Sequence, residues 1–294
     1  MSRVLQPKAV ECRLADERLA ALSWGEEGAP VWLALHGWLD NAASFSRLAP
    51  RLVEALGIRV VALDFAGHGH SAALPGEHDY ALWDYCHDIL DAMADLKLER
   101  ATLLAHSMGA GVACLLAAAL PEKVVALRLI DGLGALTTDA EDAPDQLRRS
   151  LLAHRRPRRR LPHYADQTRA VAARVAGGAT PVDAETIAPV VQRNLCPAAK
   201  GGVTLGSDPR LLRPSPVRLT PDQLLAILGA IRCPTLLIEG EGGILAERPQ
   251  AVRARAAVSG LERRVLPGGH HLHLEVTRVA AVAAALTEHA IDTS

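Results

Sequence analysis

Residues 101–109 read Ala-Thr-Leu-Leu-Ala-His-Ser-Met-Gly, and an apolar helical pattern follows from residue 111 to residue 120. An apolar strand, a serine on a sharp turn and then a helix are typical of the nucleophile elbow, Gly-x-Ser-x-Gly, here with Ala105 in the first glycine position. The turn crowds its neighbours, and Ala105 and Gly109 supply the small side chains that it needs. Ser107 is therefore our candidate nucleophile, although a serine capping a helix N-terminus gives the same five-residue pattern.

Short apolar segments alternate with helical patterns along most of the chain. We expect strands at 31–35, 59–63, 102–104, 124–130, 235–238 and 263–266, and helices at roughly 42–56, 80–96, 108–120, 247–257 and 272–288. Near-continuous apolar strands separated by helices indicate a parallel sheet that is covered on both faces. The residues before 25 read as antiparallel edge strands. The sequence thus predicts an α/β fold with a mostly parallel, eight-stranded sheet.

The alternation of strands and helices stops between about residue 135 and residue 218. This segment carries helical patterns but no convincing strand, and it ends in a stretch rich in glycine and proline. Because the alternation resumes at Thr220, we expect an inserted helical cap rather than a separate domain. The predicted division is a core of residues 1–134 and 219–294 and a cap of residues 135–218.

The composition limits the compartment and the partners. The chain has 294 residues, 49% of them hydrophobic and 22% charged, which is enough for a large core. Its net charge of −1 gives no indication of a nucleic-acid partner. The five scattered cysteines favour a reducing cytoplasm over a disulfide framework. We expect no membrane span and, at residues 1–7, no secretory signal; the oligomeric state cannot be read from the sequence.

A candidate base follows the last predicted strand, in the segment Gly268-Gly269-His270-His271-Leu272-His273. Functional groups gather at the carboxyl ends of parallel strands. We favour His270 as the general base, because it lies nearest to the strand end. His271 and His273 read as solvated loop or helix residues.

A candidate oxyanion hole follows the predicted strand at residues 31–35, where the chain reads His36-Gly37-Trp38. Glycine at position 37 allows the backbone to approach a substrate closely. We expect the N–H of Trp38 and the N–H of Met108, directly after the serine, to stabilise an oxyanion.

Four motifs in this order resemble those of the α/β-hydrolase superfamily: Leu35-His36-Gly37-Trp38-Leu39-Asp40-Asn41, Asp64-Phe65-Ala66-Gly67-His68-Gly69-His70-Ser71, Ala105-His106-Ser107-Met108-Gly109 and Gly269-His270. The resemblance covers nearly the whole chain outside the predicted cap and implies the α/β-hydrolase fold. Within the superfamily the chain most resembles the serine hydrolase-like group, whose substrates are poorly defined. The first motif and the return segment at residues 208–220 suggest that group.

The chain departs from the superfamily at the acid. Relatives carry an aspartate after the strand that matches residues 235–238, in a pattern like Gly-x-x-Asp, but here Gly243 stands at that position. We favour Asp131, which ends the strand after the nucleophile helix, because some members place their acid there. Glu241, Glu239 and the absence of any acid stay open as alternatives, and Asp131 could instead cap a turn.

These residues predict a serine hydrolase that cleaves a small or medium acyl ester or thioester through an acyl-enzyme on Ser107. Lactonase, perhydrolase and C–C bond hydrolase activities use the same residues. The alternative from another class is a ligand-binding module that has lost catalysis. We expect no cofactor and no metal, because nothing completes four ligands around His68 and His70.

Seven arginines lie between Arg148 and Arg160, inside the predicted cap and with no acid among them. A solvated helix end and loop explains such a run. The functional alternative is recruitment of anionic substrates such as acyl-CoA or other acyl carriers. In either case the predicted partner is a small-molecule acyl substrate.

Overall fold

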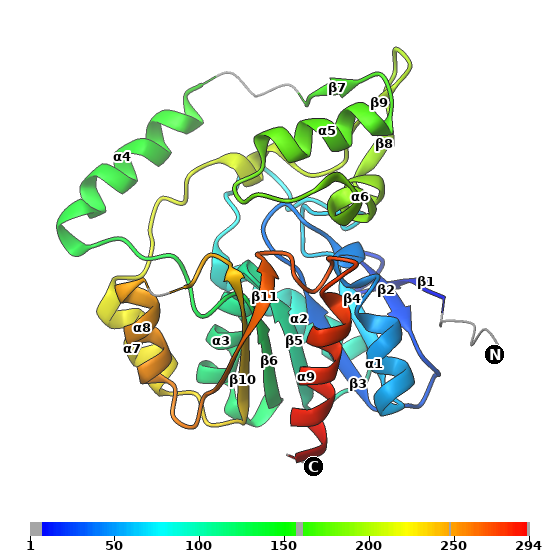
Figure 1. Ribbon diagram of the computed structural model, residues 1–294. Coiled ribbons are helices and arrows are strands. Elements are labelled where there is room, and N and C mark those ends of the chain that lie inside the picture. Colours follow the sequence, from blue (N-terminus) through cyan, green and yellow to red (C-terminus); the bar gives the residue numbers. More distant parts are fainter. Residues whose placement is uncertain (1–7, 157–160, 247, 293–294) are drawn as a thin grey trace.

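An eight-stranded sheet forms the centre of the protein. The computed structural model describes residues 8–156, 161–246 and 248–292 (Figure 1). The strands follow the order β1-β2-β4-β3-β5-β6-β10-β11. They are β1 (Val10–Leu14), β2 (Leu19–Trp24), β3 (Val31–Leu35), β4 (Arg59–Leu63), β5 (Ala101–His106), β6 (Val124–Ile130), β10 (Thr235–Gly242) and β11 (Glu262–Gly269). β2 pairs antiparallel with both β1 and β4, and all the other neighbouring strands pair parallel, which confirms the predicted sheet and its edge.

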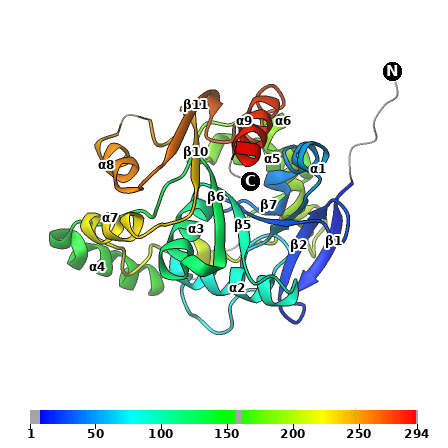
Figure 2. The same ribbon diagram turned by 90° about the horizontal axis from the view of Figure 1, so that it is seen from below.

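Helices cover both faces of this sheet. In Figure 2, α1 and α9 lie on one side, and α2, α3, α7 and α8 lie on the other. Their bounds are α1 (Ala49–Leu56), α2 (Tyr85–Asp95), α3 (Met108–Ala119), α7 (Pro221–Gly229), α8 (Pro249–Ala257) and α9 (Val279–Asp292). Alternate strand residues serve the two faces: Leu33 of β3 packs into the core under α2 and α3, whereas Ala34 packs into the core under α1 and α9.

Three of the expected helices differ from the structure, and one of them, at residues 80–96, is divided into a 3-10 turn at Leu82–Asp84 and α2. The first, at residues 42–56, is split into a 3-10 turn and α1, which starts with Pro50 in its first turn. The last, at residues 272–288, begins only at Val279. Residues 270–278 form turns instead, and from these turns His270 and His271 reach the buried carboxylates of Asp131 and Asp40. The 3-10 turns are η1 (Ala42–Phe45), η2 (Leu82–Asp84), η3 (Pro121–Lys123), η4 (Ala140–Asp142) and η5 (Pro209–Leu212).

Residues 135–218, which we call the insert, contribute no described strand to the central sheet. The described part of the insert holds three α-helices, α4 (Ala143–His154), α5 (Gln167–Gly177) and α6 (Ala184–Arg193). The expectation that it lacks strands is wrong, because three short strands form a second, antiparallel sheet in the order β7-β9-β8. They are β7 (His163–Tyr164), β8 (Leu195–Pro197) and β9 (Val203–Leu205). Two or three residues give too little periodicity to recognise.

The insert lies at the end of the sheet toward which β10 and β11 point (Figure 1). Its helices α5 and α6 share a small apolar cluster with Leu274, from the segment before α9. No helix in the described ranges is long and apolar enough to cross a membrane. The expectation about a secretory signal concerns residues 1–7, which lie outside the described residues.

A buried ion pair joins the insert to the central sheet. Arg193, at the end of α6, donates to Asp64, which follows β4, with an N···O distance of 2.9 Å. Its guanidinium also contacts Glu11 of β1. Asp64 is fully buried, and it also accepts the backbone N–H groups of Ala42 and His70. These bonds satisfy the carboxylate that follows β4 and give it a structural role.

Replacing Arg193 by leucine should lower the free energy of unfolding by about 3–5 kcal/mol, because it leaves the charge of Asp64 buried without its partner. Equilibrium urea unfolding measures this change. Arg169→Gln, which removes an exposed arginine from α5, is the matched control and should change stability by no more than about 0.5 kcal/mol. Equal stability of the Arg193→Leu and control variants would contradict this account of the ion pair.

Candidate active site

Ser107 lies on a strained turn between β5 and α3. Its backbone angles are φ 52° and ψ −115°, in a region that residues other than glycine rarely adopt. Two glycines make room for the turn. A Cβ atom at Gly109 would lie 2.3 Å from the carbonyl oxygen of Leu35, and one at Gly132 would lie 2.6 Å from the carbonyl oxygen of Ser107. The motif indicated Gly109, whereas Gly132 comes from another strand end and escaped the sequence analysis.

His270 follows β11 and lies beside the serine. Its Nε2 atom is 2.9 Å from the Oγ atom of Ser107, and only 7% of the residue is exposed. Its Nδ1 atom faces Asp131. Because a carboxylate can only accept, Nδ1 carries the proton and Nε2 is left to accept the proton of the serine hydroxyl.

Asp131 follows β6 and is fully buried. Its Oδ2 atom accepts hydrogen bonds from His270 Nδ1 at 2.6 Å and from the backbone N–H of Ile244 at 2.9 Å. Its Oδ1 atom lies 3.3 Å from the backbone nitrogen of Gly240, which donates to it. The backbone of Asp131 has a φ of 40°, a second strained position at this site. We call Ser107, His270 and Asp131 the triad.

The two glutamates that the sequence left open lie away from His270. Glu239 is buried, but its carboxylate pairs with Arg255 and Arg263, each at 2.9 Å. Glu241 is exposed at the end of β10. Of the three acidic candidates, Asp131 is therefore the one that contacts His270.

The position of Asp131 explains why residue 243 is a glycine. A Cβ atom built on Gly243 would lie 2.1 Å from Oδ1 of Asp131 and 2.6 Å from its Cγ. The carboxylate of Asp131 thus fills the space that a side chain at position 243 would need. The aspartate at position 131 thus accounts for the glycine at position 243, where relatives carry their acid.

The segments that carry the predicted oxyanion donors begin beside the serine. Gly37 packs closely here, because a Cβ atom on it would lie 3.2 Å from the Cβ of Ser107. Trp38 follows Gly37, and its indole Nε1 donates to the carbonyl oxygen of Leu211 at 3.0 Å. Met108 is the first residue of α3, so its N–H has no acceptor within the helix. The role of these two N–H groups stays a prediction.

The expectation that His271 and His273 are solvated is wrong. His271 is 4% exposed, and its Nε2 donates to Oδ2 of Asp40 at 3.0 Å. His273 is fully buried and is hydrogen-bonded to Oγ of Ser44 at 2.9 Å. The turns of residues 270–278 direct these side chains inward, which a helical pattern could not indicate.

Asp40, His106 and His271 form the described group whose donor atoms come within 4.8 Å of one another, the spacing of metal ligands. Both carboxylate oxygens of Asp40, however, are already used for hydrogen bonds. Oδ1 of Asp40 accepts from the guanidinium of Arg174 at 2.9 Å, and Oδ2 accepts from His271. A cation would be repelled by that guanidinium, so these residues do not fit a metal centre and we derive no step through one.

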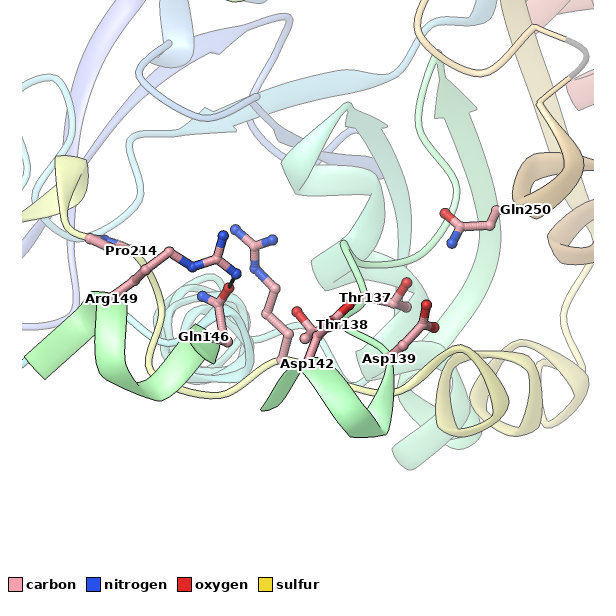
Figure 3. A pocket seen from close by; sticks show the side chains of 9 residues that line it. Thr137, Thr138, Asp139, Asp142, Gln146, Arg149, Pro214 and Gln250 are labelled. Carbon is pink, nitrogen blue, oxygen red and sulfur yellow. Dashed lines mark hydrogen bonds between the residues drawn. The ribbon is translucent and has the colours of Figure 1, made fainter. Parts of the chain in front are cut away.

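A polar cavity of about 340 Å³ lies beside α4. Figure 3 shows Arg149 hydrogen-bonded to Gln146 there, with a distance of 3.1 Å. The lining residues are Thr137, Thr138, Asp139, Asp142, Gln146, Arg149, Pro214, Arg218 and Gln250. The triad is not among them. Of the seven arginines noted in the sequence, Arg149 is the one that lines this cavity, and those at 158–160 lie outside the described residues.

Comparison with known proteins places the chain in a family. Residues 30–182 match the family model described as the alpha/beta hydrolase fold. The chain belongs to the α/β-hydrolase family. It is 31% identical over 271 residues to a serine hydrolase-like protein of Dictyostelium discoideum, covering 88% of this chain and 75% of the relative. A serine hydrolase-like protein of Danio rerio is 28% identical over 284 residues, with 89% and 85% covered.

Solved structures extend this comparison. A hypothetical protein from Pseudomonas aeruginosa PAO1 is 45% identical to this α/β-hydrolase, with a TM-score of 0.87 over 96% of this chain and 98% of the other. The thioesterase domain from the curacin biosynthetic pathway is 28% identical, with a TM-score of 0.78 over 98% and 99% of the two chains.

Replacing Gly243 by alanine in this α/β-hydrolase should lower the free energy of unfolding by about 1–3 kcal/mol, because the new methyl group would overlap the carboxylate of Asp131. In an Asp131→Gly background, which suits the positive φ, the same change should cost much less. Urea unfolding of the four proteins gives the coupling energy between the two positions. An equal cost of Gly243→Ala in both backgrounds would contradict the overlap.

Proposed function

We propose that this α/β-hydrolase cleaves a small or medium acyl ester or thioester through an acyl-enzyme on Ser107. The observation that carries the proposal is the unbroken set of hydrogen bonds from Asp131 through His270 to the hydroxyl of Ser107. The serine hydrolase-like names of the relatives and the thioesterase domain among the similar structures support it.

In the proposed mechanism, Oγ of Ser107 attacks the carbonyl carbon of the substrate while Nε2 of His270 takes its proton. Asp131 holds the Nδ1–H tautomer of His270 and stabilises the imidazolium that forms. The N–H groups of Trp38 and Met108 donate to the oxyanion. His270 then returns the proton to the leaving alcohol or thiol, and water, activated by the same imidazole, releases the acid and restores the serine.

We further propose that the insert of residues 135–218 is the cap of this enzyme and that residues 1–134 and 219–294 are its core. Two contacts near the predicted oxyanion loop support the cap. The indole of Trp38 donates to Leu211, and the side chain of Asn41 donates to the carbonyl oxygen of Val190 at 2.8 Å. A cap held at the oxyanion loop would bound the acyl pocket and limit the size of the acyl group.

The five free cysteines support a reducing cytoplasm as the compartment of this enzyme.

The triad geometry favours catalysis over a ligand-binding module without activity. A glycine at position 243, where relatives carry the acid, would favour such a module if no other acid were present, but the carboxylate of Asp131 occupies the same space. Lactonase, perhydrolase and C–C bond hydrolase chemistry would use the same three side chains. A substrate screen separates those reactions from ester and thioester hydrolysis.

Hydrolysis of p-nitrophenyl esters and acyl-CoAs of graded chain length tests the proposal. Ser107→Ala should lower kcat by about 10⁴-fold or more with the fold intact. Asp131→Asn should cost on the order of 10⁴-fold, because it favours the wrong tautomer of His270. Glu241→Gln, which changes an exposed acid on the neighbouring strand, is the control and should keep nearly full activity. Undiminished turnover by Ser107→Ala would exclude the mechanism.

A further inference from the structure

A second cluster of polar side chains lies next to His270, the proposed base. It consists of Asp40, Arg174, His271 and His106, and we call it the Asp40 cluster. Asp40 is 2% exposed and belongs to the loop of the predicted oxyanion hole, where its N–H donates to the carbonyl oxygen of Gly37. Burial alone would raise the pKa of its carboxyl, but His271 and Arg174 outweigh burial and hold the pKa well below its usual range. Asp40 is thus a buried carboxylate with two charge-assisted partners.

His106 touches the proposed base through the backbone. Its Nε2 atom is 2.9 Å from the carbonyl oxygen of His270, and since a carbonyl only accepts, Nε2 carries the proton. Its Nδ1 atom is buried without a hydrogen-bond partner and lies 3.8 Å from Oδ2 of Asp40. Burial lowers the pKa of His106 well below its usual value, so the ring is neutral. The tautomer of His106 is therefore fixed by the backbone of His270.

These contacts hold the peptide unit between His270 and His271 at both ends. His106 holds the carbonyl group of His270, and Asp40 holds the side chain of His271. Asp131 fixes the ring of His270 from a third direction. Moving Asp40 or His106 would therefore move the backbone from which the imidazole of His270 projects.

One member of the cluster comes from the insert. Arg174 lies on α5, and its guanidinium reaches Oδ1 of Asp40 at 2.9 Å. Arg47 makes a second connection between the core and the insert. It donates to the carbonyl oxygen of Leu274 and to that of Glu185, near the start of α6. The loop that carries the proposed base and the helices of the insert thus share polar contacts.

We propose that the Asp40 cluster positions His270 and makes its position depend on how the insert is seated. The four members are positioning residues, since none of them touches the serine hydroxyl. The inference rests on the proposed function, in which His270 is the base. A displacement of about 1 Å at a base can cost on the order of 100-fold in rate, so a modest shift of the insert has a large effect on turnover.

Three single variants at two positions of α5 test the connection to the insert. Arg174→Gln should lower kcat for p-nitrophenyl acetate about tenfold with a smaller change in KM, and it should shift or broaden the downfield proton resonance of the His270–Asp131 hydrogen bond. Arg174→Lys should keep most of the rate, because it keeps the charge. Arg169→Gln, at an exposed arginine of the same helix, should behave as the wild type in both measurements.

Two variants at His106 test the same proposal independently, in case the Arg174 variants misfold. His106→Leu removes the donor to the carbonyl group of His270 and should give the same loss of rate and the same change in the resonance. His106→Gln, whose amide can donate from nearly the same place, should restore much of both. If Arg174→Gln and His106→Leu match the wild type in rate and resonance while Ser107→Ala is inactive, the positioning proposal is wrong and the proposed function stands. If Ser107→Ala keeps full activity, the proposed function fails, and the resonance alone then decides whether the cluster positions His270.

Discussion

The hydrogen bond between His270 and Asp131 is the constraint on which the rest of the site depends. It joins the ends of β11 and β6, and β10 lies between these two strands in the sheet. The carboxylate of Asp131 must therefore pass over the end of β10. That strand end accordingly offers glycine and backbone N–H donors: Gly243 leaves room for the carboxylate, and Gly240 donates to it. The position of the acid thus requires a glycine at position 243, directly after β10.

Buried carboxylates organise the same end of the sheet in three places. Asp40, Asp64 and Asp131 each follow a strand of the sheet, and each is at most 2% exposed. A buried charge is tolerated only with partners, and each of the three accepts several hydrogen bonds. Asp64 and Asp40 take arginines from α6 and α5 of the insert, whereas Asp131 takes the imidazole of His270. The first two therefore seat the insert, and the third serves the triad.

The sequence was sufficient to predict the structural features that depend on a single motif or a single strand. The parallel sheet, its antiparallel edge and the elbow at Ser107 follow from local pattern, because apolar runs and small residues leave direct marks in the sequence. Asp131 could be favoured because it ends a recognisable strand. Its carboxylate is hydrogen-bonded to His270, while its catalytic role stays a prediction.

Features that depend on contacts between distant segments could not be predicted. His271 and His273 lie in turns, and their side chains are hydrogen-bonded to Asp40 and Ser44, more than 200 positions away in the chain. Gly132 is required only because the backbone of Ser107 lies against it. The three short strands of the insert are stabilised by pairing with one another rather than by their own pattern.

The central claim is that Ser107 is the group that becomes acylated. Peptide mapping by mass spectrometry after incubation with a fluorophosphonate tests it most directly, since this reagent bonds to an activated serine and needs no knowledge of the substrate. We expect a single phosphonyl group on the peptide that contains Ser107, and none on the folded Ser107→Ala protein. An unmodified Ser107, or a modification that persists in Ser107→Ala, would contradict it.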